Sequence, residues 1–121
     1  MIDGVHALIY VKDARKAREF FRDILKFPSI NAGDGWLIFA LPPAELGIHP
    51  TGGKSYHELY LMCDDIQSTV KELKGKGIKV IPIHEERWGL ATSIMIPGGG
   101  EIGLYQPTHP TASIQKDAKF K

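Results

Sequence analysis

The chain has 121 residues, of which 43% are hydrophobic and 24% charged, a composition typical of one folded globular domain. Fifteen Lys and Arg residues nearly balance fourteen Asp and Glu residues, which argues against nucleic-acid binding. The longest apolar runs, such as residues 37–41, are too short to cross a membrane. The chain has one cysteine, Cys63, and its first residues do not resemble a secretory signal, so we expect a cytoplasmic location.

The first half of the chain begins with a predicted strand at residues 6–13, in which apolar residues alternate with others. Asp13 occupies the N-cap position of a predicted helix, because apolar residues recur at helical spacing from Ala14 to Leu25. Three extended segments are predicted after the helix, at residues 29–32, 36–42 and 45–49. The first half is therefore predicted to be a βαβββ unit.

The second half repeats this order about 52 residues later. A strand at 58–65 leads to Asp65, which is predicted to cap a helix that stops at Gly75–Gly77. Extended segments follow at residues 78–83, 88–97 and 101–105, with a hairpin turn at Gly98–Gly100. At this offset His6 lies opposite Glu58 and Trp36 opposite Trp88, whereas the closing strands are offset by 56.

A sheet with a helix on one face leaves its other face free, and a βαβββ unit is too small to bury that face alone. The alternation of side chains directs polar and aromatic residues of both halves, including His6, Glu58, Tyr60 and Tyr105, to this free face. We therefore expect an α+β fold in which two βαβββ modules form a concave, cup-like mixed sheet with the helices outside.

Three segments resemble the vicinal oxygen chelate superfamily, which contains glyoxalase I, bleomycin resistance proteins and extradiol dioxygenases. They are HALIYVKDARKAREFFRDIL, HELYLMCDDIQSTVKELKGKGI and PGGGEIGLYQP. The resemblance implies a single domain over residues 1–107, with repeats at about 5–50 and 57–107 and a polar tail at 108–121. It also implies a homodimer and, in some members, a divalent ion that activates oxygens of the substrate.

The first-strand ligand positions of the family match His6 and Glu58, but the last-strand positions match Gly47 and Gly103, which have no side chain to bind metal. His49 lies two residues after Gly47 and therefore on the same face of its strand. His6, His49 and Glu58 are thus the predicted ligands of an Fe, Mn, Zn or Ni ion. The alternative for Glu58 is an ion pair with His6.

Two functions remain open at this point. The first is a metal-dependent enzyme, such as a lyase, isomerase or dioxygenase, acting on a small oxygen-rich substrate with Glu58 as the catalytic proton-transfer group. The alternative is a metal-free protein of the bleomycin-resistance type that binds or sequesters a small molecule. In both cases the substrate-binding candidates are aromatic, and core packing is the competing role for each: Trp36, Tyr60, Trp88 and Tyr105.

Overall fold

A computed structural model describes residues 6–109, so most of the predicted tail lies outside the described residues. Both helices begin at the expected aspartates. The Asp13 carboxylate accepts a hydrogen bond from the Lys16 N–H at 3.1 Å, and Asp65 accepts one from the Ser68 N–H at 3.2 Å. Helix α1 spans Ala14–Glu19 and continues as a π-helical turn, η1, over Phe20–Ile24, while α2 spans Ile66–Gly75.

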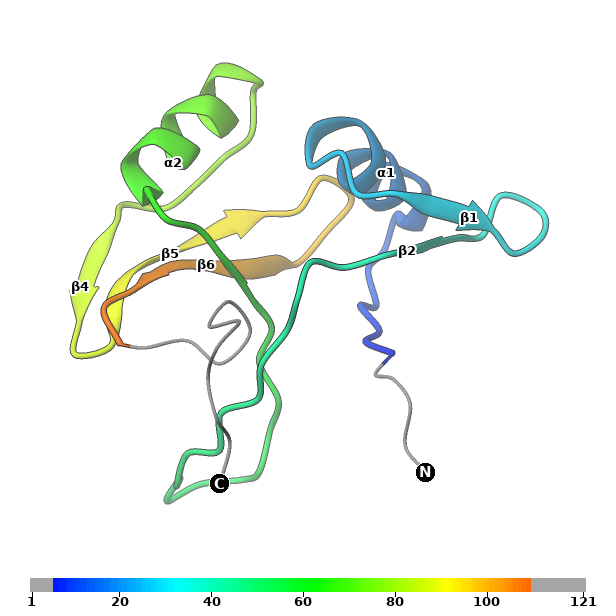
Figure 1. Ribbon diagram of the computed structural model, residues 1–121. Helices are drawn as coiled ribbons and strands as arrows, with labels where there is room; N and C mark the ends of the chain where they lie inside the picture. Colours follow the sequence, from blue (N-terminus) through cyan, green and yellow to red (C-terminus); the bar gives the residue numbers. More distant parts are fainter. Residues whose placement is uncertain (1–5, 110–121) are drawn as a thin grey trace.

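The second half forms the complete βαβββ module (Figure 1). Its four strands lie in the order β3-β6-β5-β4, with β3 parallel to β6 and the other pairs antiparallel. The strands are β3 (Tyr60–Met62), β4 (His84–Glu86), β5 (Gly89–Met95) and β6 (Glu101–Pro107). The strand expected at 78–83 is reduced to a single bridge between Val80 and Ile94, and regular pairing starts only at β4.

The first half keeps its helix and its central hairpin, in which β1 (Ser29–Asn31) pairs antiparallel with β2 (Leu37–Phe39). The predicted strands at 6–13 and 45–49 are wrong for this structure, because neither segment joins a sheet. The chain between β2 and β3 runs toward the second module rather than along residues 6–12 (Figure 1). In this connection the Glu45 carboxylate accepts a hydrogen bond from Tyr105 of β6. Leu8 and Ile48 are consequently 67% and 88% exposed.

One hydrophobic core connects the two halves on the helix side of the β5–β6 hairpin. The expected alternation is confirmed there, since Ile102 and Leu104 are buried and Leu61 and Cys63 pack against them. The buried members of this core are Ala17, Phe20, Phe21, Ile66, Val70, Leu73, Ile78, Ile94, Ile96, Ile102 and Leu104.

Helix α1 meets the second module at the glycine turn between β5 and β6. The Asp13 N–H donates to the Gly98 carbonyl at 2.9 Å, and a Cβ at position 98 would collide with the Asp13 carbonyl. Gly98 also has a φ of +104°, which other residues rarely adopt. The hairpin turn expected at Gly98–Gly100 is confirmed, and its first glycine allows the two halves to approach closely. No helix in residues 6–109 is long and apolar enough to span a bilayer.

Candidate functional site

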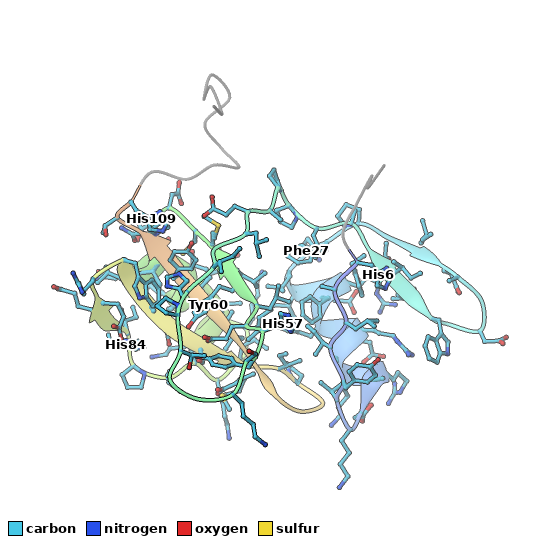
Figure 2. All side chains as sticks on the ribbon, turned by 90° about the horizontal axis from the view of Figure 1, so that it is seen from below. His6, Phe27, His57, Tyr60, His84 and His109 are labelled. Atoms are coloured by element: carbon cyan, nitrogen blue, oxygen red, sulfur yellow. The ribbon has the colours of Figure 1, made fainter. Side chains whose placement is uncertain are left out.

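Three aromatic rings pack together on the face of the second sheet that points away from the helices. We call Tyr60, Trp88 and Tyr105 the aromatic triad. Their ring centroids lie 5.3–5.7 Å apart, and all three pairs meet edge to face at interplanar angles of 75–86°. Each ring is half-buried, so the triad is a preformed apolar surface that still faces solvent. Figure 2 shows Tyr60 on this side of the molecule.

The strand register explains why these rings meet. Tyr60 of β3 pairs with Gly103 of the parallel strand β6, and Tyr105 follows two residues later on the same face. A Cβ at position 103 would collide with the Tyr60 ring, so this ring fills the space that a side chain at 103 would need. Gly103 therefore allows the triad to form. Trp88 completes it from the residue just before β5.

Carboxylates lie close enough to both phenols of the triad to raise their pKa. The Tyr105 hydroxyl donates to Glu45 Oε1 at 3.5 Å. Partial burial raises the pKa of Tyr105, and the negative charge of Glu45 raises it further. Burial also raises the pKa of Tyr60, with a hydrogen bond to the Glu58 carboxylate as the next cause. The neutral phenols are thus favoured beside these carboxylates.

The structure adds one ring that the sequence did not single out. The imidazole of His109 lies 6.1 Å from the Tyr105 ring, tilted by 32° (Figure 2). The sequence placed His109 in the tail, where no spacing pointed to a role. The sequence did contain one signal for this contact: His109 lies four residues after Tyr105 and two residues beyond the end of β6.

Trp36 is the one predicted substrate-binding residue that does not join the others. It lies just before β2, is 64% exposed, and stacks with the Arg18 guanidinium, whose Cζ is 5.0 Å from the ring centroid. This cation–π contact stabilises the surface of the first half. The other three predicted aromatic residues are brought together as the triad.

The predicted metal ligands are not assembled in this structure. Within residues 6–109, no three His, Cys, Asp or Glu side chains form a group that could hold a metal ion. His6 lies on the half of the molecule that contains α1, away from Tyr60 (Figure 2), and His49 and Glu58 are exposed. At the position of the family's last ligand, the Tyr60 ring takes the space above Gly103. The donors as arranged here do not fit a divalent ion.

Cys63 lies on the helix side, as its place in the strand predicted. Burial raises the pKa of its thiol, and the Sγ atom lies 3.6 Å from the Tyr105 carbonyl oxygen. A thiol in this environment is a weak nucleophile.

The fold and the sequence together define the class of protein. The model of the Glyoxalase/Bleomycin resistance protein/Dioxygenase superfamily matches residues 5–102, and the chain belongs to this superfamily. No curated protein matches the sequence.

Several solved structures share the fold. TnmS3, an antibiotic binding protein from Streptomyces sp. CB03234, is 26% identical over 86% of this chain and 100% of its own, with a TM-score of 0.59. A superfamily member from Sphaerobacter thermophilus DSM 20745 is 27% identical over 87% of this chain and 98% of its own, with a TM-score of 0.63. A lactoylglutathione lyase from Agrobacterium tumefaciens is 15% identical over 86% of this chain and 92% of its own, with a TM-score of 0.63, and shows the fold alone.

Proposed function

We propose that this protein binds a small, flat apolar molecule, such as an antibiotic, against the aromatic triad and sequesters it without chemical change. The observation that carries the proposal is the mutual packing of Tyr60, Trp88 and Tyr105 on the face free of helices. The similarity to TnmS3, which is described as an antibiotic binding protein, supports the same class of ligand.

The physical basis is the apolar surface that the triad leaves in water. Covering such surface stabilises a complex by about 25 cal/mol per Å². Edge-to-face contacts between the three rings already fix their orientations, so little side-chain entropy remains to be lost when a ligand binds.

The protein has two tryptophans, which makes the test direct. In a Trp36→Phe variant, Trp88 is the only tryptophan and reports on the triad. We expect acridine, or members of a panel of polycyclic aromatic antibiotics, to quench this emission saturably. A Tyr105→Leu change in the same background should weaken binding at least about tenfold, because one wall of the triad is lost. If no compound binds, or if the Tyr105 variant binds equally well, the proposal fails.

We also propose a cytoplasmic homodimer. Large apolar side chains are exposed on two segments that the internal repeat predicts as strands, among them Leu8, Tyr10, Leu46 and Ile48. Each of these segments exposes large apolar side chains, and exposed apolar surface is typical of protein interfaces. Light scattering should give twice the chain mass, and a monomer at all concentrations would contradict the dimer.

The metal-dependent enzyme stays an alternative prediction, with His6, His49 and Glu58 as ligands. Elemental analysis after loading with Fe, Mn, Zn and Ni separates the two functions. One tightly held ion per chain that is lost in Glu58→Ala would favour the enzyme. Saturable ligand binding at the triad that is unchanged by chelator would favour the binding protein.

A further inference from the structure

The aromatic triad is bordered by acidic side chains from three different segments. Glu45 comes from the connection between β2 and β3, is half-buried, and accepts a hydrogen bond from Tyr105. Glu58 precedes β3, and its carboxylate raises the pKa of Tyr60. Glu86 ends β4, two residues before Trp88, and its Oε1 lies 3.0 Å from His84 Nδ1. Three glutamates that are distant in sequence thus place negative charge around the aromatic triad.

The pKa shifts of Tyr60 and Tyr105 indicate the sign of the charges near the triad. Within the described chain, the charges that shift the pKa of Tyr60 come from Glu58, Glu86 and the phenol of Tyr56, and the charge that shifts the pKa of Tyr105 comes from Glu45; all of them raise the pKa. Arg87 is next to Trp88 in sequence, but its side chain is exposed. Carboxylates are therefore the main charges beside these rings, although the whole chain carries a net charge of +1.

We infer that the ligand of the aromatic triad is an organic cation, with a positive charge carried on or beside a flat aromatic body. This inference rests on the proposed function and specifies its ligand class. Aromatic ring faces attract cations through their quadrupole, by about 0.5–2 kcal/mol when the cation is partly desolvated. Glu45 and Glu58, one at each phenol, add charge attraction on the same side.

An anionic ligand fits this patch poorly, because it would lie against carboxylates from three segments. A neutral aromatic would gain from the rings but not from the charges. The cation is the one class that uses both features, so charge determines selectivity while the apolar area supplies affinity.

Three acridines of nearly equal size isolate the effect of charge. They are 10-methylacridinium, which is always a cation, acridine, which is neutral at pH 7.5, and acridine-9-carboxylate, an anion. With Trp36→Phe as the background, quenching of Trp88 gives the dissociation constant of each at low and high salt. We expect the cation to bind about tenfold more tightly than acridine and the anion most weakly, with the preference decreasing as salt rises.

Neutral variants test which carboxylates are responsible. Glu45→Gln and Glu58→Gln should each reduce the ratio of cation affinity to acridine affinity. Glu72→Gln is the matched control, because Glu72 lies exposed on α2 and pairs with Lys76 rather than with the triad. It should leave the preference intact, and circular dichroism would check that each variant is folded.

The outcomes distinguish the two proposals. Equal binding of the cation and acridine overturns the inference and leaves the proposed function standing. A cation preference that survives in Glu45→Gln, Glu58→Gln and the double variant also overturns it. Failure of all three acridines to bind overturns the inference, and if the antibiotic panel fails as well, the proposed function falls with it.

Discussion

The ring of Tyr60 lies over the backbone of Gly103, in the space that a side chain at position 103 would occupy. A Gly103→Ala change places a methyl group against this ring. The ring is rigid, so it cannot give way as the end of a flexible side chain would. Inserting a methyl group into a packed site costs about 1–3 kcal/mol. We expect the ring to be displaced and ligand binding at the triad to weaken about tenfold.

Ligand titration and the near-ultraviolet circular dichroism of the aromatic residues measure these two effects. Gly53→Ala is the matched control, because a Cβ there would meet only Thr51 Oγ1 at an ordinary 3.9 Å. An unchanged aromatic spectrum in Gly103→Ala would show that the ring does not depend on the glycine.

The junction between α1 and the β5–β6 turn should be among the most sensitive backbone sites. Gly98→Ala forces a non-glycine residue to φ +104° and also brings its Cβ against the Asp13 carbonyl. Gly77→Ala imposes a φ of +80° with no atom near its Cβ. The backbone strain alone is worth about 1–3 kcal/mol. Urea denaturation should show a larger loss for Gly98→Ala than for Gly77→Ala, and equal losses would contradict the close approach.

The cap of α2 gives a prediction with a neighbouring control. Asp65→Ala removes the side chain that accepts from the Ser68 N–H, and we expect unfolding free energy to fall by about 0.5–2 kcal/mol. Asp64 is exposed beside it and does not cap the helix, so Asp64→Ala should change stability much less. Thermal denaturation followed at 222 nm compares the two, and the reverse order would count against the cap.

The phenols of the triad predict a change at alkaline pH. The folded-state pKa of Tyr60 and of Tyr105 lies above the ordinary value of 10.0. The unfolded chain therefore loses these protons first, so their contribution to stability is complete below about pH 10 and disappears as the pH rises through the folded pKa.

Absorbance at 295 nm measures the ionisation directly. Subtracting the titration curve of Tyr60→Phe from that of the native protein gives the ionisation of Tyr60 alone, and Tyr105→Phe gives that of Tyr105 in the same way. Each of these two phenols should titrate above pH 10. Titration of either difference below that pH would show that the phenol is not shielded by burial and its carboxylate.

The thiol of Cys63 should react slowly. It is the single cysteine, half-buried against the core, and burial raises its pKa. We expect a disulfide reagent such as DTNB to label the native protein at least about tenfold more slowly than the urea-unfolded chain at pH 8. Equal rates would place the sulfur at the surface.

Local signals in the sequence were sufficient for the helix starts, the core-facing residues of the last strand and the glycine turn. The caps at Asp13 and Asp65, the apolar alternation that buries Ile102 and Leu104, and the hairpin at Gly98–Gly100 depend on near neighbours, and all were predicted. The expected strands at 6–13 and 45–49 depend on a partner strand. The alternation of side chains does not show where the connection after β2 runs. In the structure this connection brings Glu45 to Tyr105 and does not pair with residues 6–13.

The candidate site was predicted in part for the same reason. Tyr60, Trp88 and Tyr105 were placed on one face by alternation, which gives direction, and the structure adds the distances. Gly103 was noted only as a missing metal ligand. Gly103 meets Tyr60 only because β3 and β6 pair in this particular register, in which Tyr60 and Gly103 are partners although they are 43 residues apart in sequence. No local sequence pattern encodes the register of two such distant strands.

The core described above contains side chains from both halves, with Phe20 and Phe21 of the first beside Ile94 and Leu104 of the second. Neither half can open without exposing the buried surface of the other, so we expect the two repeats to melt as one cooperative unit. A protease cut in the exposed connection near Gly52 would break the polypeptide but not this shared interior. The two fragments would stay associated and could reassemble by complementation after separation, which neither would achieve as an independent folding unit.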